Sequence, residues 1–235
     1  MKLILYSFRI CPFVERTNIL LNEKKIECQR VYVDIRNKPE WFLKLSPLGK
    51  VPALSIDGKI IFESTVINEF LNELDPSQSL HPDDIVEKAS NRSWIEWGST
   101  LIFDAYNMTL TKIQNDFDEK KKIVDIKLIL LEEQLTKAPF FNGDKFSMID
   151  LAYAPLFRRF NSLLVQYSID MLKQYPKLQA WSHHILQRPA VKDGFVHNFD
   201  EEFRLLLELK ESCLVPKNPV EEKQISSLAF NSQEY

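Results

Sequence analysis

The spacing of hydrophobic positions in the first third of the chain alternates between two patterns. Residues 3–6 and 31–33 are short apolar runs, which predict strands. Between residues 11 and 24 the apolar side chains recur at helical spacing instead. Residues 39–45 show the same spacing, with a proline at what we predict to be the first helical position. The predicted order up to this point is strand, helix, strand, helix.

A hairpin signal follows these elements. Residues 52–56 and 59–62 are two short apolar runs separated by Asp57-Gly58, and both of these turn residues tolerate a positive φ. Glu63 and Ser64 then open a predicted helix that runs towards residue 74. A parallel strand pair, a hairpin and a covering helix predict a thioredoxin-like α/β domain over residues 1–75.

The rest of the chain follows an almost wholly helical pattern. Residues 75–82 are polar, contain two prolines and predict a linker. Beyond the linker we expect an all-α domain over residues 83–214 and a polar tail over residues 215–235. Ser147 and Asp150 form a variant of the helix-capping box. The helices are predicted at residues 85–117, 118–135, 147–167, 178–187 and 201–208.

Composition narrows the function classes. The 235 residues carry a net charge of −3, which disfavours a general electrostatic attraction to nucleic acid or to an anionic membrane. No apolar run approaches the roughly 20 residues of a membrane-spanning helix, and Arg9 interrupts the only stretch that resembles a signal peptide. The three cysteines form no disulfide framework and no metal-binding pattern. We therefore expect a cytoplasmic protein without a metal.

Cys11 is the candidate reactive residue. It lies where the first strand passes into a helix, and Pro12 suits the first helical position. Backbone N–H groups and the helix dipole at this place favour the thiolate over the thiol. The alternative is a small apolar residue of the core. Position 14 is valine, so no resolving thiol lies one turn away, and a small external thiol such as glutathione would have to clear a mixed disulfide.

Two further features suit a ligand with amino-acid ends. Val51 precedes Pro52, and a cis bond there would turn the Val51 backbone towards Cys11; the alternative is an ordinary strand-initial proline. Glu63 can bind an ammonium group, while Ser64 and its helix start can bind a carboxylate, as the γ-glutamyl end of glutathione requires. Ser64 could also be only an N-cap.

These residues and their order resemble the cytosolic glutathione transferase superfamily, most closely its omega class. The resemblance implies a glutathione site formed by Lys38, Val51, Glu63 and Ser64, with Lys38 paired to the glycyl carboxylate and Cys11 forming a mixed disulfide with glutathione. The segments that carry the resemblance are residues 11–16, 37–42, 51–52, 63–64 and 147–150.

The resemblance also implies a function. Omega-like enzymes are associated with thioltransferase and dehydroascorbate reductase activities, and homodimers are usual in the superfamily. Two alternatives remain open: a transferase that conjugates glutathione to electrophiles, for which Ser7 is a fallback hydroxyl, and a non-enzymatic binding or regulatory relative. The acceptor pocket should lie between the domains. Its candidate aromatic residues are Phe8, Phe13, Trp97, Phe103 and Tyr106.

Overall fold

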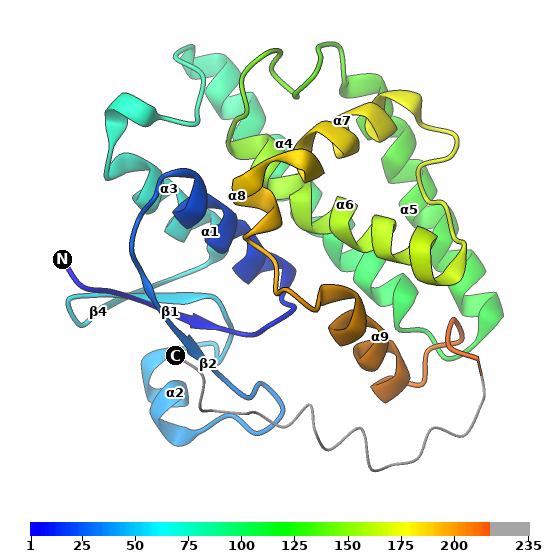
Figure 1. Cartoon of the computed structure of the whole chain (residues 1–235), viewed down its shortest axis with the longest axis horizontal. Coiled ribbons are helices and arrows are strands. Elements are labelled where there is room, and N and C mark those ends of the chain that lie inside the picture. Colours follow the sequence, from blue (N-terminus) through cyan, green and yellow to red (C-terminus); the bar gives the residue numbers. More distant parts are fainter. Residues whose placement is uncertain (217–235) are drawn as a thin grey trace.

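The amino-terminal part of the chain is a four-stranded mixed sheet with helices on both faces (Figure 1), as the computed structural model, which describes residues 1–216, shows. The strands lie in the order β2-β1-β3-β4. β1 runs parallel to β2 and antiparallel to β3, which continues antiparallel into β4. The elements are β1 (Leu3–Ser7), α1 (Pro12–Glu23), β2 (Gln29–Tyr32), α2 (Glu40–Leu45), β3 (Ala53–Ile56), β4 (Lys59–Phe62) and α3 (Ser64–Glu73).

This part has the predicted thioredoxin-like order. The hairpin turns at Asp57 and Gly58 with φ of 48° and 90°, as the Asp-Gly pair indicated. Leu5 of β1 pairs with Leu54 of β3, and both side chains are fully buried under α1 and α3. In Figure 1, α1 and α3 lie on one side of the sheet and α2 lies on the other. The fold-class prediction is confirmed.

Several predicted boundaries shift by one or two residues. The second strand begins at Gln29 and ends before Val33, whose N–H still donates to the Ser7 carbonyl at 2.8 Å. Pro39 is the N-cap of α2 and lies outside the helix, because its ψ of 149° is extended. The N-cap of α3 is Glu63, so the interpretation of Ser64 as an N-cap was wrong by one position.

The remainder is helical, and the first long helix that we predicted there is interrupted. The expected helix over residues 85–117 is broken after Thr109, and Phe117 belongs to the next helix. The hydroxyls of Thr109 and Thr111 donate to the Tyr106 and Met108 carbonyls, which competes with continued helix hydrogen bonding. The elements are η1 (Pro76–Gln78), α4 (Ile85–Thr109), α5 (Gln114–Gln134), α6 (Met148–Tyr167), α7 (Pro176–Gln187), α8 (Pro189–Lys192) and α9 (Phe199–Leu209).

The capping box of α6 is present and does more than close a helix end. Asp150 accepts hydrogen bonds from the N–H and the hydroxyl of Ser147, at 2.8 and 2.6 Å. Its other oxygen accepts from the Phe141 N–H and from the Trp181 indole of α7. The carboxyl is fully buried, and burial raises its pKa. One side chain therefore ties a loop, α6 and α7 together.

One continuous core joins the sheet part to the helical part. Gly98 lets α4 approach α6 closely, because a β-carbon there would lie 2.6 Å from the Tyr153 ring. The Tyr153 hydroxyl then donates to the Trp94 carbonyl at 2.8 Å. No helix within residues 1–216 is both long and apolar enough to cross a membrane. Apart from Val215 and Pro216, the predicted polar tail lies outside the described residues.

A charged cluster joins α3, the interdomain segment and α4. Glu69 accepts hydrogen bonds from Nε and Nη2 of Arg92, at 2.9 and 2.7 Å, and its carboxylate lies 2.9 Å from His81 Nε2. Partial burial acts to raise the pKa of Glu69, but the hydrogen bonds from His81 and Arg92 outweigh it and hold the pKa at about 2. The cluster therefore stabilises the fold when Glu69 is ionised.

We predict that Glu69→Gln lowers the free energy of unfolding at pH 7 by about 1–3 kcal/mol, the range for hydrogen bonds to charged groups. A depressed folded-state pKa gives stability that is present above the ordinary value of 4.5 and lost as pH falls towards 2. The difference in the free energy of unfolding between wild type and variant, measured by urea titration, should therefore become smaller below pH 4.5. The exposed Glu133→Gln is the control, and a difference that is absent at pH 7, or constant down to pH 4, contradicts the prediction.

Candidate functional site

Cys11 is held rigidly at the start of α1. It is the N-cap residue, with extended φ and ψ of −80° and 120°, and Pro12 opens the helix. The Cys11 N–H donates to the Phe8 carbonyl at 3.2 Å, and the Cys11 carbonyl accepts from the Glu15 N–H at 3.0 Å. The backbone on both sides of the sulfur is thus fixed by hydrogen bonds.

The sulfur faces the loop that leads into β3. The Val51–Pro52 peptide bond is cis, and the Cys11 Sγ lies 3.9 Å from the Val51 carbonyl oxygen. Residues forty positions apart in sequence are therefore in contact, as the sequence predicted for this pair.

Glu63 and Ser64 lie next to this loop because of the hairpin register. Ala53 pairs with Phe62, so the residues that follow outward, Pro52 and Glu63, are neighbours at the same end of the hairpin. Glu63 has φ of 68°, which is uncommon for a residue with a side chain and costs about 1–3 kcal/mol. Among the described residues no side chain caps the first turn of α3, whose first residue is the buried Ser64. Unused N–H groups at a helix start form an anion site.

Lys38 lies on the other side of the same loop. Its side chain is exposed, and its Nζ would lie 3.6 Å from a β-carbon placed on Gly49, two residues before Val51. The structure therefore brings Lys38 to the loop that carries Val51, and brings Glu63 and Ser64 to the end of the hairpin that begins there. Of the four predicted binding residues, Val51 contacts Cys11, and the other three lie close to the segment that carries Val51 or at the hairpin end next to it.

The ionisation of Cys11 differs from our expectation. Burial of the sulfur raises the pKa of the thiol above its ordinary value, although the residue as a whole stays partly accessible. Hydrogen bonds from the N–H groups of Val14 and Phe13 act in the opposite direction and lower the pKa, as the helix-start reasoning anticipated. They are outweighed. The helix-start effect is present, but the prediction that it makes the thiolate the favoured form was wrong, because burial raises the pKa of the thiol by more.

Glu15 and Arg159 were not among the site residues predicted from the sequence. They form a buried ion pair at 2.6 Å beneath Cys11, joining α1 to α6. The sequence feature that could have indicated this pair is a charged residue on the otherwise apolar face of each of the two helices. Of the aromatic candidates, Tyr106 lies close enough to Cys11 that their charges interact, and burial raises the Tyr106 pKa.

Other candidates lie elsewhere. Trp97 packs against Trp94 and lies beneath the ammonium of Lys127 from α5, and Phe103 is 58% exposed. The Ser7 hydroxyl is buried, with no hydrogen-bond partner in the described part of the chain. Within residues 1–216, no group of three or more His, Cys, Asp or Glu side chains could hold a metal ion.

Two family models match the chain, in the order of its two structural parts. The glutathione S-transferase N-terminal domain matches residues 10–74, and the glutathione S-transferase C-terminal domain matches residues 117–184. The first match covers Cys11 and all four predicted binding residues. The second covers most of α5, all of α6 and most of α7.

Individual relatives give the same result. The chain is 36% identical to glutathione S-transferase omega-1 of Sus scrofa over 189 residues, which covers 79% of this chain and 77% of that protein. It is 38% identical over 147 residues, 62% of this chain and 64% of the relative, to the Oryza sativa protein named "Probable glutathione S-transferase DHAR1, cytosolic". The crystal structure of glutathione transferase Omega 3C from Trametes versicolor superposes with a TM-score of 0.73 at 27% identity, covering 83% of this chain and 89% of that one. The chain belongs to the glutathione S-transferase family and is similar to its omega class.

Proposed function

We propose that this protein is a glutathione-dependent thioltransferase that works through a mixed disulfide between Cys11 and glutathione. The observation that carries the proposal is the sulfur itself, held at the start of α1 and 3.9 Å from the Val51 carbonyl. Val14 occupies the position one turn on, and all three cysteines are free. A disulfide formed on Cys11 then has to be resolved by a second molecule, and glutathione is the thiol that this family uses.

Glutathione binding is assigned to the neighbourhood of the Val51 loop. The Val51 backbone N–H and C=O pair with the extended tripeptide, as a strand added to a sheet edge would. The uncapped start of α3 and the Ser64 hydroxyl hold the γ-glutamyl carboxylate, and Glu63 accepts from its ammonium group. Lys38 pairs with the glycyl carboxylate. The strained Glu63 backbone supports this role, because such conformations concentrate at ligand sites.

The reaction cycle has two exchange steps. The Cys11 thiolate attacks the glutathionyl sulfur of a mixed disulfide, a Cys11–glutathione disulfide forms, and the acceptor leaves as a thiolate that takes up a proton. A second glutathione, as thiolate, then attacks the glutathionyl sulfur of that disulfide. Oxidised glutathione leaves, and Cys11 is returned in its reduced form. The N–H groups of Phe13 and Val14 stabilise the Cys11 thiolate as it departs.

Dehydroascorbate is the second proposed acceptor. It accepts two electrons and two protons from two glutathiones, which leave as oxidised glutathione while ascorbate is formed. The similarity to the rice protein named DHAR1 and to omega transferases supports this substrate class. A cytosolic location fits the chemistry, because thiols stay reduced there.

We predict that Cys11→Ser lowers the rate of glutathione-dependent reduction of hydroxyethyl disulfide at least about 100-fold, because an alcohol forms no disulfide. Cys28→Ser is the matched control and should keep the wild-type rate. Conjugation of glutathione to a chlorinated aromatic electrophile should be weak in the wild type. Full disulfide reduction by Cys11→Ser, or dominant conjugation by the wild type, would contradict the proposed mechanism.

We also predict that Lys38→Ala and Glu63→Gln each raise the KM for glutathione about 10–100-fold, since each removes a hydrogen bond between charged groups. The maximal rate should change less, because neither residue touches the sulfur. Steady-state kinetics with varied glutathione measure both constants. Lys44→Ala, an exposed lysine of α2, is the control for general loss of positive charge. A wild-type KM in both site variants would remove these residues from the glutathione site.

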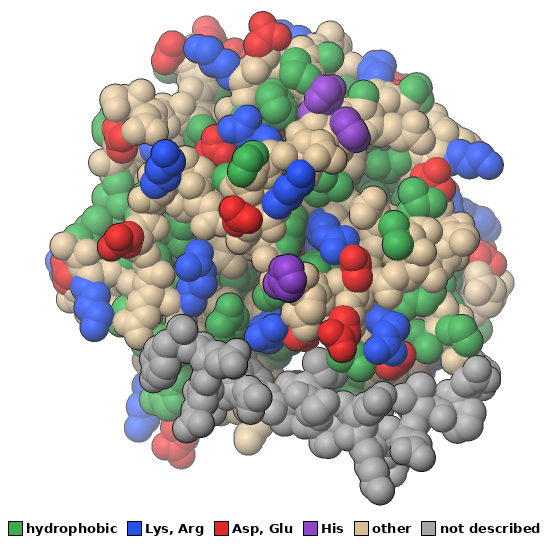
Figure 2. Space-filling view, viewed as in Figure 1, with side chains coloured by type: hydrophobic (Ala, Val, Ile, Leu, Met, Phe, Trp, Pro, Cys, Tyr) green, Lys and Arg blue, Asp and Glu red, His purple; other side chains and the backbone are tan. Residues whose placement is uncertain are grey.

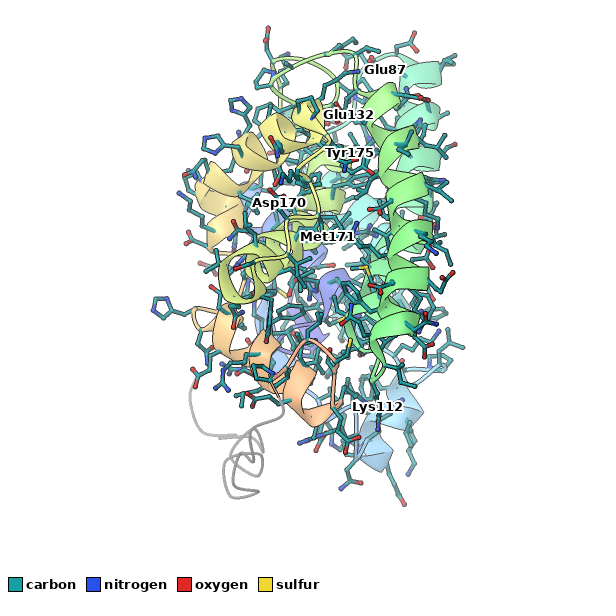
Figure 3. All side chains as sticks on the ribbon, turned by 90° about the vertical axis from the view of Figure 1, so that its right-hand side faces the viewer. Glu87, Lys112, Glu132, Asp170, Met171 and Tyr175 are labelled. Carbon is teal, nitrogen blue, oxygen red and sulfur yellow. The ribbon has the colours of Figure 1, made fainter. Side chains whose placement is uncertain are left out.

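A homodimer is part of the proposal. α4 and α5 lie side by side along one flank of the helical part, shown in Figure 3. Both helices expose large apolar side chains to solvent. On α5 these recur at positions 123, 126, 129 and 130, one face of a helix. Soluble monomers rarely leave such contiguous patches uncovered, so this face suits a second copy of the chain. The exposed residues are Phe103, Ile123, Ile126, Ile129 and Leu130.

We predict that the wild type elutes as a dimer in size-exclusion chromatography with light scattering, and that Ile126→Glu elutes as a monomer, because it buries a charge in the contact. Val165→Glu is a matched control, since Val165 is 70% exposed on α6, away from this face. A wild type that is monomeric at micromolar concentration refutes the assignment.

A further inference from the structure

The Arg159 guanidinium, on α6, makes four hydrogen bonds beneath the start of α1. It donates to both Glu15 carboxylate oxygens, at 2.6 and 3.1 Å, which is a bidentate pair. It also donates to the Ile10 carbonyl at 2.6 Å and to the Pro155 carbonyl at 2.9 Å. The Arg159 and Glu15 side chains are 7% and 1% exposed. Nη1 and Nη2 of a guanidinium from the helical part are thus both hydrogen-bonded at the start of α1.

Two of these partners flank Cys11. Ile10 is the residue immediately before it, and Glu15 donates its own N–H to the Cys11 carbonyl. Arg159 therefore holds the chain just ahead of the cysteine and the first turn just after it. A shift of α6 relative to α1 would move the sulfur with respect to the Val51 carbonyl.

The charges that face the sulfur come from three helices. Glu15 of α1 raises the pKa of the Cys11 thiol, and Arg159 of α6 lowers it. Arg16 of α1 and Tyr106 of α4 also interact with the Cys11 charge. Burial raises the pKa of the Glu15 carboxyl, while Arg159 and, at longer range, Arg158 lower it. The carboxylate of Glu15 lies so near a reacting anion that its charge must be balanced.

We propose that Arg159 is a positioning residue of the Cys11 site: it fixes the backbone on both sides of the cysteine and neutralises the Glu15 carboxylate beneath the sulfur. This inference rests on the proposed function, in which the Cys11 thiolate is the nucleophile. A buried ion pair contributes little net stability compared with apolar side chains of the same size. Loss of one partner is costly, but the presence of the pair as a whole is not explained by stability, so a requirement of the site accounts for it.

The test distinguishes a positioning role from a purely structural one, because Arg159 and Glu15 shift the pKa of the Cys11 thiol in opposite directions. The probe is iodoacetamide, which alkylates the thiolate and needs neither glutathione nor turnover, in a background with Cys28→Ser and Cys213→Ser. Rates are measured from pH 6 to pH 10. Arg159→Met should raise the Cys11 pKa and slow alkylation at pH 7 about tenfold, while Glu15→Gln should lower the pKa and speed alkylation about tenfold. These changes correspond to about one pKa unit each way.

The double variant Arg159→Met with Glu15→Gln removes both charges, and its alkylation pKa should lie between those of the single variants. Arg159→Lys keeps the positive charge but loses the bidentate geometry. Its Cys11 pKa should therefore equal that of the wild type, whereas its rate of disulfide reduction should stay below the wild-type rate. The matched control is Arg204→Met, whose partner is Glu208 of the same helix, and it should leave the alkylation pKa unchanged.

The proposal would be overturned if the Cys11 pKa shifted in the same direction in the two single variants, or if it shifted in neither of them. If Arg159→Met does not fold, Glu15→Gln and Arg159→Lys still decide it, because an unshifted pKa in Glu15→Gln contradicts the electrostatic role. Failure of the proposed function has a different signature. In that case Cys11→Ser stays active in disulfide reduction, whatever the alkylation rates show.

Discussion

The burial of the charged face of α1 is the constraint on which the rest of the structure depends. Glu15 and Arg16 lie inside the molecule at 1% exposure each, and neither can find water there. Glu15 is satisfied by Arg159, and Arg16 donates to the Ala152 carbonyl and to the Ser99 hydroxyl. All three partners belong to α4 or α6. The sheet part therefore needs the helical part to satisfy its own first helix, which explains why a single core spans both.

This arrangement places the Cys11 sulfur at the boundary between the two parts. Figure 1 shows α1 between the sheet and α6, and Cys11 precedes the first turn of that helix. Burial raises the thiol pKa there, and helix-start N–H groups and an arginine from the other part offset that rise. The pKa of the Cys11 thiol is therefore set by a balance between desolvation and nearby charges. The surface of α6, α7 and α8 seen in Figure 2 carries histidine and basic side chains, and Cys11 is not among the residues that line the cavity there.

Much of this could be predicted from the sequence. The strand and helix order, the Asp57-Gly58 turn and the approach of Val51 to Cys11 follow from local patterns that the structure keeps. The break after Thr109 did not follow, because it arises from two threonine hydroxyls and carries no glycine or proline. The pKa direction of Cys11 was also missed. Helix-start effects are visible in a sequence, whereas the depth of burial and the position of Arg159, 148 residues further along the chain, depend on tertiary packing.

The most direct test of Cys11 as the residue that forms the mixed disulfide is to determine which cysteine becomes glutathionylated. The protein is incubated with oxidised glutathione, digested without reduction, and each cysteine-containing peptide is analysed by mass spectrometry. We predict one glutathionyl group, on Cys11, which disappears when reduced glutathione is added. An adduct confined to Cys28 or Cys213, or a Cys11 adduct that reduced glutathione does not remove, would contradict this prediction.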